Sequence, residues 1–281
     1  MQSTEGPSLP MLLFHGLLSS PQEFGLIHHS MRARGLRHEA VQVAGYTSGT
    51  ASAAPDWRQW RAEAAALVRA RALDGQPVLL GGLCMGGILA AAAALAAPAH
   101  VAGLVLMSPS FEFDGWGQSP VRHLRHIAYW TGLHRYFGMS EREPFGVKND
   151  KIRKWISSQL REGADSAAGP ARVSLTALRE GERMLAEVRA RLGELQCPIL
   201  LIHARDDEIS SLAGVERLFG RLPQRDKELV VLDNSYHMIT IDNDRHEVSS
   251  LLSQFSRRVS APYFPMPPEQ AALPERGARF A

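Results

Sequence analysis

The chain has 281 residues, of which 45% are hydrophobic and 21% are charged. These proportions are typical of a folded globular protein, and they exclude a disordered, collagen-like or coiled-coil chain. Lys and Arg (31) nearly balance Asp and Glu (29), so the net charge of +2 gives no reason to expect a nucleic-acid or membrane partner.

The cysteine count and the first residues indicate the compartment. Two cysteines cannot form a disulfide framework, and the Cys/His clusters typical of zinc sites are absent, so we expect no metal and no cofactor. The start carries Glu5 and lacks a basic segment, which differs from a secretory signal. We therefore expect a cytoplasmic protein.

An uncharged stretch between Asp74 and Glu112 is long enough for a membrane span. Glycines and Pro98 interrupt it, and much of its middle is alanine, which is weakly apolar. Its pattern divides into short pieces typical of a buried parallel sheet, so we expect no membrane span. The pieces are a strand at Pro77–Gly82, a helix at Met85–Ala97 and a strand at Val101–Met107.

Strand-like runs alternate with helical patterns elsewhere, which predicts βαβ units and an α/β fold. The earlier elements are expected as strands at Met11–His15 and Ala40–Ala44 and helices at Gln22–Arg34 and 57–72. Asp56 is a favourable N-cap for the second helix. The later elements are expected as strands at Pro198–His203 and Glu228–Leu232 and helices at Ser210–Arg221 and Asp244–Ser260.

Residues 111–195 lack strong strand patterns and are rich in aromatic and basic residues. We interpret them as a cap inserted into a core formed by 1–110 and 196–260, and we expect the cap to consist mainly of helices and loops. The proline-rich tail, 261–281, is expected to be flexible.

Cys84 stands between a predicted strand and a predicted helix, in the run Gly82-Leu-Cys84-Met-Gly86. A nucleophile in a sharp strand-to-helix turn needs small residues two positions before and after it. The N-terminus of the following helix favours a thiolate and can hold an oxyanion. The alternative is a small buried side chain in a tight turn.

Two later loops supply an acid and a histidine in the order that such a nucleophile requires. Asp206 and Asp207 follow one predicted strand, and His237 follows the next. A base that activates the nucleophile and an acid that orients the base complete a triad. Asp242 remains a distant alternative partner for His237.

The chain resembles the α/β-hydrolase superfamily, and within it capped bacterial carboxylesterases and monoacylglycerol lipases. The resemblance is carried by Phe14–Leu17, the elbow at Cys84, Ala204–Glu208 and Ser235–Thr240. It implies a mostly parallel sheet with helices on both faces and a helical cap.

The same resemblance assigns further residues. It implies that Asp207, the fourth residue of the acid loop, is the triad acid, with Asp206 and then Asp114 as alternatives. It also implies an oxyanion hole formed by the backbone N–H groups of Leu17 and Met85. His15 is expected to brace the oxyanion loop.

The elbow departs from the family pattern, because it carries cysteine instead of serine. An acyl-cysteine intermediate is itself a thioester. Exchange of the acyl group with another thioester, or its transfer to an alcohol or amine, therefore has a free-energy change that is close to zero or favourable. We expect an acyl ester or thioester hydrolase that forms an acyl-Cys84 intermediate. An acyltransferase using the same triad and a non-catalytic binding scaffold are the alternatives.

The expected cap is basic between Trp116 and Arg161. Such a surface could attract the phosphates of coenzyme A or an acyl-carrier protein, or it could be solvated and without a partner. Its bases are Arg122, Arg125, Arg135, Arg142, Lys148, Lys151, Arg153, Lys154 and Arg161, against the acids Glu141, Glu143 and Asp150. Its aromatics, expected to line an acyl pocket or to pack the cap, are Trp116, Tyr129, Trp130, Tyr136, Phe137 and Trp155.

Overall fold

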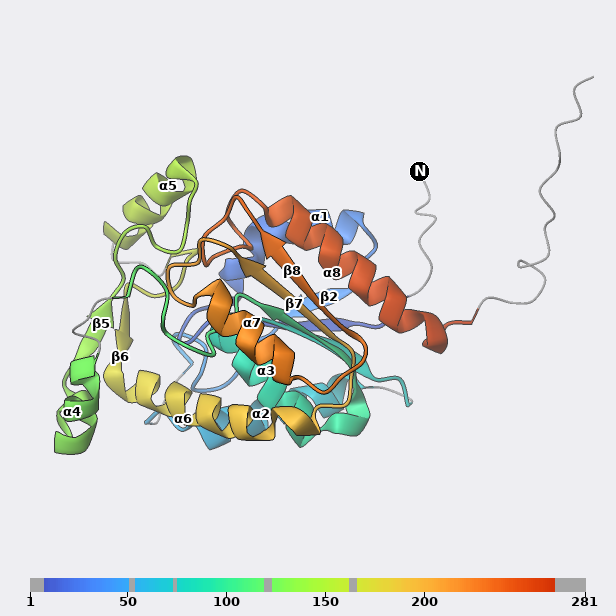
Figure 1. Ribbon diagram of the computed structural model, residues 1–281, viewed down its shortest axis with the longest axis horizontal. Coiled ribbons are helices and arrows are strands. Elements are labelled where there is room, and N and C mark those ends of the chain that lie inside the picture. The colour runs from blue at the N-terminus through green and yellow to red at the C-terminus, as the bar shows by residue number, and fades with distance from the viewer. Residues whose placement is uncertain (1–7, 51–53, 73–74, 119–122, 162–165, 266–281) are drawn as a thin grey trace, which may run out of the picture.

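A six-stranded sheet in the order β2-β1-β3-β4-β7-β8 forms the centre of the computed structural model (Figure 1). The model describes residues 8–50, 54–72, 75–118, 123–161 and 166–265. All neighbouring strands of this sheet are parallel. The strands are β1 (Met11–Phe14), β2 (His38–Ala40), β3 (Val78–Leu83), β4 (Val101–Met107), β7 (Ile199–Ala204) and β8 (Lys227–Leu232).

Helices cover both faces of the sheet, as predicted. Successive side chains of a strand point to opposite faces, and β1 shows this directly. Leu12 and Phe14 pack in one core cluster, and Met11 and Leu13 pack in the other. The first cluster includes α2 (Trp57–Arg71), α3 (Met85–Ala96), α6 (Leu175–Arg191) and α7 (Leu212–Arg221); the second includes α1 (Gly25–Ala33) and α8 (Arg245–Ser260) (Figure 1).

The uncharged stretch folds as β3, α3, the 3-10 helix η2 (Pro98–His100) and β4, which confirms its predicted division. β3 and β4 are buried along their whole length, which explains their unbroken apolar sequence. In the described parts of the chain, no helix is both long enough and apolar enough to cross a membrane.

The predicted strand at Ala40–Ala44 is wrong in position, since β2 ends at Ala40. Thr47 accounts for the difference, because its hydroxyl accepts the Val43 N–H at 2.9 Å. The Thr47 N–H in turn donates to the Val43 carbonyl, also at 2.9 Å. This local turn takes residues 43–47 out of the sheet. By contrast, the Asp56 cap is present and accepts the N–H of Arg58 at 2.9 Å.

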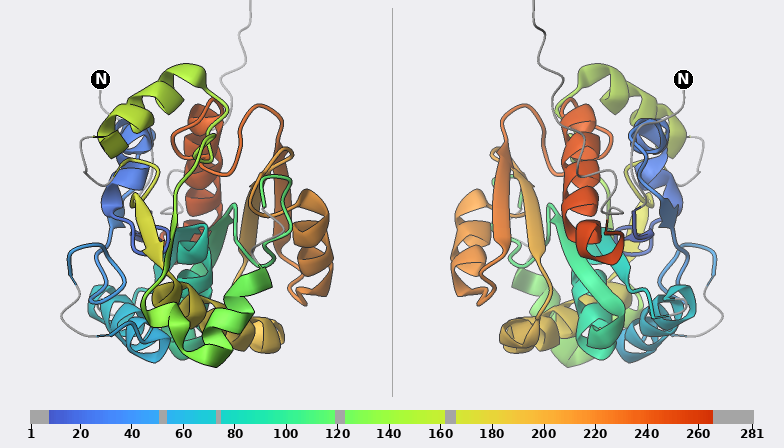
Figure 2. Two further views of the ribbon diagram at one scale, coloured as in Figure 1. Left: turned by 90° about the vertical axis from the view of Figure 1, so that its left-hand side faces the viewer. Right: turned by 90° about the vertical axis from the view of Figure 1, so that its right-hand side faces the viewer.

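The part of the chain between β4 and α6 lies at the end of the sheet where the strands terminate (Figure 2, left). Its β5–β6 antiparallel pair was not expected from the sequence, where helices and loops were predicted. The helix that follows, α6, buries Ala177, Met184 and Val188 in the core cluster of α2 and α3. The other elements are α4 (Leu124–Thr131), η4 (Leu133–Arg135), β5 (Gly138–Ser140), α5 (Asp150–Arg161), β6 (Arg172–Ser174) and η5 (Leu192–Glu194).

Two predictions concern residues outside the described ranges. The first is the contribution of Arg122 to the basic surface of the cap. The tail is described only through residue 265, with the 3-10 helix η6 (Ala261–Tyr263), so the predicted flexibility of 266–281 lies outside the described residues. The boundaries of the cap at 111 and 195 remain our proposal.

Candidate active site

Five loops meet at the carboxyl end of the parallel sheet. They follow β1, β3, β4, β7 and β8, and they contain Gly16, Cys84, Ser110, Asp207 and His237 respectively. In open parallel sheets this edge is where ligands and catalytic groups gather. Residues that are more than 200 positions apart in the sequence are therefore neighbours.

The elbow holds Cys84 in a left-handed backbone conformation, with φ 56° and ψ −125°. A Cβ atom on Gly82 would lie 2.2 Å from the Gly86 carbonyl oxygen. A Cβ atom on Gly86 would lie 2.1 Å from the Phe14 carbonyl oxygen. Both glycines are therefore required by backbone contacts, as the small-x-Cys-x-small pattern predicts.

The Cys84 sulfur is partly exposed and lies 3.2 Å from the hydroxyl oxygen of Ser110. Ser110 is fully buried and follows β4, the strand next to β3 in the sheet. If Cys84 is a thiolate, it can only accept, and Ser110 is then the hydrogen-bond donor. The hydroxyl dipole thus stabilises negative charge on the sulfur.

His237 and Asp207 form a buried pair. His237 Nδ1 donates to Asp207 Oδ2 at 2.8 Å, and Asp207 Oδ1 accepts the N–H groups of Ile209 (2.8 Å) and Ser210 (2.9 Å). Burial alone would raise the pKa of Asp207, but the charge of His237 and these hydrogen bonds outweigh it and lower that pKa. Asp207 is thus held as a carboxylate.

The pKa of His237 is raised well above its ordinary value of 6.5. Burial acts in the opposite direction and lowers it, but the attraction of Asp207 and of the neighbouring Cys84 outweighs burial. His237 Nε2 is buried and makes no hydrogen bond of ordinary geometry within the described residues. The arrangement favours an imidazolium beside the sulfur of Cys84.

The alternative acids have other partners. Asp206 is half-exposed and pairs with Lys148 at 3.0 Å. Asp114 accepts from the backbone and the hydroxyl of Ser211, at 2.8 and 2.6 Å. Asp242 accepts four backbone N–H groups, those of Lys148, Asn149, Tyr236 and Asn243. None of the three accepts a hydrogen bond from His237 among the described contacts.

Leu17 and Met85 lie on facing sides of the elbow, where their side chains approach the same point of α6, at Gly181. Met85 is the first residue of α3, so its N–H has no acceptor within the helix. The Leu17 loop is held by Glu23, whose carboxylate accepts the Gly16 N–H at 2.7 Å.

His15 is buried and makes two short contacts, with the Gly16 carbonyl and the Thr47 hydroxyl, both at 2.8 Å. Tyr46 donates its hydroxyl to the His15 carbonyl at 3.0 Å. Burial lowers the pKa of His15 to about 4, so its ring is neutral near pH 7. These contacts suit the expected brace of the loop after β1.

Four residues near the triad were not singled out from the sequence. They are Ser110, Glu23, Glu208 and His203. Glu208 accepts the backbone N–H of His237 at 3.2 Å, and His203 lies 3.7 Å from the Asp207 carboxylate. Of these four, only Ser110 and Glu208 could have been identified from the sequence. Ser110 follows the strand next to the elbow strand, and Glu208 is the neighbour of Asp207 in the sequence.

The basic and aromatic residues of the cap do not form a packed interior. Lys148 pairs with Asp206, and Arg125 pairs with Glu182 at 2.6 Å. Most of the aromatic side chains are exposed instead of buried, with Trp130 at 89%. The exposed ones are Trp116, Trp130, Tyr136, Phe137 and Trp155. Among the described residues, no three His, Cys, Asp or Glu side chains are grouped so that they could hold a metal ion.

A family model described as serine aminopeptidase, S33 (Hydrolase_4) matches residues 7–244. The chain belongs to this family. It is therefore an enzyme of the α/β-hydrolase type, as the resemblance implied, and its parallel sheet is the fold of that superfamily. The family is named for a serine, whereas this member carries Cys84 at the elbow.

Individual proteins are similar to this chain in sequence or in fold. The thermostable monoacylglycerol lipase of Bacillus sp. (strain H-257) is 32% identical over 63 residues, which is 22% of this chain and 25% of that lipase. The monoacylglycerol lipase of Paleococcus ferrophilus superposes with a TM-score of 0.72 at 18% identity, covering 89% of this chain and 95% of the other. A monoglyceride lipase from Saccharomyces cerevisiae gives 0.75 at 16% identity, covering 92% and 89%.

Proposed function

We propose that this protein is a cysteine-dependent acyl ester hydrolase in which Cys84 is acylated, His237 moves protons and Asp207 orients His237. The observation that carries the proposal is the buried hydrogen bond between Asp207 and His237, with His237 close enough to Cys84, at the glycine-flanked elbow, for the two side chains to interact electrostatically. Small acyl esters of the monoacylglycerol type are the proposed substrates, in keeping with the lipase that matches part of the sequence.

The reaction begins with attack of the Cys84 thiolate on the ester carbonyl carbon. The carbonyl oxygen takes up the negative charge between the N–H groups of Leu17 and Met85. The C–O bond to the alcohol then breaks, and His237 Nε2 donates its proton to the departing alkoxide. An acyl thioester on Cys84 remains, and His237 is neutral.

Deacylation reverses these roles. A water molecule attacks the thioester carbonyl, and neutral His237 takes its proton. The C–S bond breaks, the carboxylic product leaves, and the imidazolium–thiolate pair is restored. Asp207 keeps Nδ1 as the donor throughout, so Nε2 is the nitrogen that exchanges protons.

The cysteine at the elbow favours one second candidate, transfer of the acyl group from a thioester to an alcohol or amine. The bond made to Cys84 is a thioester, so its formation from coenzyme A or a carrier protein costs little energy. Five cap bases have no carboxylate partner in the described ranges and would attract the phosphates of such a donor. They are Arg135, Arg142, Lys151, Lys154 and Arg161. A reducing cytoplasm, which we propose as the location, keeps the thiol free.

Turnover of a monoacylglycerol and of an acyl thioester, each with and without an added alcohol or amine, tests the proposal. We expect release of free carboxylate to exceed transfer, and a loss on the order of 10³-fold in Cys84→Ala. Cys197→Ala is the matched control, because Cys197 is buried away from the triad and should keep full activity. Full turnover in Cys84→Ala would contradict the assignment, and transfer exceeding hydrolysis would favour the acyltransferase.

A further inference from the structure

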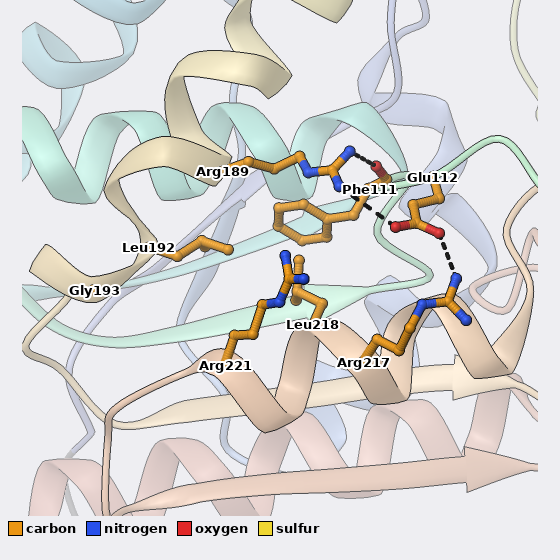
Figure 3. A pocket seen from close by; sticks show the side chains of 8 residues that line it. All are labelled: Phe111, Glu112, Arg189, Leu192, Gly193, Arg217, Leu218 and Arg221. Atoms are coloured by element: carbon orange, nitrogen blue, oxygen red, sulfur yellow. Dashed lines mark hydrogen bonds and ion pairs between the residues drawn. The ribbon is translucent and has the colours of Figure 1, made fainter.

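A pocket outside the candidate active site lies between the end of α6 and α7, on the flank of the sheet (Figure 3). Its volume is about 150 Å³. It is smaller than the ~300–1,000 Å³ typical of sites for drug-sized molecules, so it suits a ligand of a few heavy atoms. Its walls are formed by Phe111, Glu112, Arg189, Leu192, Gly193, Arg217, Leu218 and Arg221.

The charges around this pocket are unbalanced. Three arginines and one carboxylate, that of Glu112, line it, and Asp114 outside the lining lies 3.5 Å from Arg217. Arg217 contacts one oxygen of Glu112 at 2.6 Å, and Arg189 contacts the other at 3.4 Å. Arg221 extends from α7 toward Phe111 without a contact to Glu112 (Figure 3). Arg221 has no carboxylate partner among the described residues, so the lining carries an excess of positive charge.

The floor of the pocket is apolar and buried. Phe111, Leu192 and Leu218 are buried, at 1%, 6% and 7% exposure. Gly193 also lines the pocket, and an added Cβ atom there would meet no other atom within 4 Å. The combination of a guanidinium rim and an apolar floor is suited to a small anion that has an apolar side.

We propose that this pocket binds a small oxyanion, a carboxylate or a phosphate, at the guanidinium group of Arg221 and beside Glu112. Guanidinium groups bind both anions through paired, charge-assisted hydrogen bonds. Glu112 occupies the other two arginines as an internal carboxylate and therefore competes with the ligand. This site goes beyond the proposed ester hydrolysis and does not depend on it.

Titration with butyrate and, separately, with inorganic phosphate tests the proposal by calorimetry at constant ionic strength. Butyramide is the neutral control for butyrate. We expect the Kd of the preferred anion to rise on the order of tenfold in Arg221→Ala, because one charge-assisted contact is lost. Gly193→Leu should have a similar effect by filling the pocket while leaving its charge unchanged.

Two further variants sharpen the test. Glu112→Gln removes the internal competitor, so the Kd should fall several-fold. Arg225→Ala is the matched control, because Arg225 is an exposed arginine near α7 that does not line the pocket. Tighter binding of butyrate identifies a carboxylate ligand, and tighter binding of phosphate identifies a phosphate ligand. Binding of neither anion up to about 10 mM, or equal weakening in the Arg221 and Arg225 variants, overturns the proposal.

Discussion

The sulfur of Cys84 and the hydroxyl of Ser110 lie 3.2 Å apart, on loops that follow the adjacent strands β3 and β4. The thiol therefore has a hydroxyl partner on one side and His237 on another. A negative charge on the sulfur would accept a hydrogen bond from the hydroxyl and attract the positive charge of His237.

Replacement of Ser110 by alanine should make Cys84 less reactive, because the thiolate loses its hydroxyl donor. We expect the rate of alkylation by iodoacetamide at pH 7 to fall about tenfold, which corresponds to ~1.4 kcal/mol. Ser256→Ala is the control, since its buried hydroxyl lies in α8 and has no partner within the described residues. An unchanged alkylation rate in Ser110→Ala would show that the contact does not stabilise the thiolate.

Replacement of Asp207 by asparagine should lower the pKa of His237, because burial lowers this pKa and the carboxylate that raises it is lost. NMR titration of the His237 ring nitrogens measures this directly. Asp206→Asn is a matched control, since Asp206 pairs with Lys148 at the surface and should leave His237 unchanged. If Asp206→Asn changes the pKa of His237 and Asp207→Asn does not, the triad acid has been assigned to the wrong residue.

The same pair predicts how stability depends on pH. The lowered pKa of Asp207 contributes stability above its unfolded value of about 3.9, and this is lost as the pH falls. The raised pKa of His237 contributes stability that is complete below about 6.5 and is lost as the pH rises through the folded value. Chemical denaturation should therefore show that Asp207→Asn lowers the free energy of unfolding most between about pH 4 and 6.5. If the variant instead loses more stability as the pH becomes alkaline, the assigned direction of the pKa shifts is wrong.

Glu23 is buried, and burial raises its pKa to about 7 despite the hydrogen bond from Gly16. Its ionisation therefore costs stability, and this cost develops as the pH rises from about 4.5 to 7. Glu23→Gln keeps an acceptor for the Gly16 N–H and should be more stable than wild type at pH 8, by up to about 3 kcal/mol. At pH 4 the two proteins should be nearly equal. An equal difference at both pH values would contradict the assigned ionisation.

Replacement of Gly86 by alanine should destabilise the protein by about 3–5 kcal/mol, because the new methyl group would collide with the backbone after β1. Gly220→Ala is the matched control, since a Cβ atom there meets nothing within 4 Å. Thermal unfolding of both variants measures the difference. Equal melting temperatures would mean that the elbow can relax.

The parallel sheet and the triad order could be predicted because they rest on local patterns. Cys84 lies between two glycines, Asp207 follows the buried strand β7, and His237 follows β8, whose apolar run the sequence also shows. β5 and β6 could not be predicted, since three-residue strands leave no detectable alternation and depend on tertiary contacts. Glu23 was missed for a similar reason: its role comes from a contact with Gly16 seven residues away, in a loop whose path the sequence does not specify.

The most direct measurement is the intact mass of the protein after brief mixing with a small acyl thioester or an activated ester. We expect a mass increase of one acyl group in wild type and in Cys197→Ala, mapped by peptide fragmentation to residue 84. The adduct should be absent in Cys84→Ala and should persist in His237→Gln if acylation still proceeds, because deacylation needs the imidazole. An acyl group found on any other residue, or retained in Cys84→Ala, would contradict the proposed mechanism.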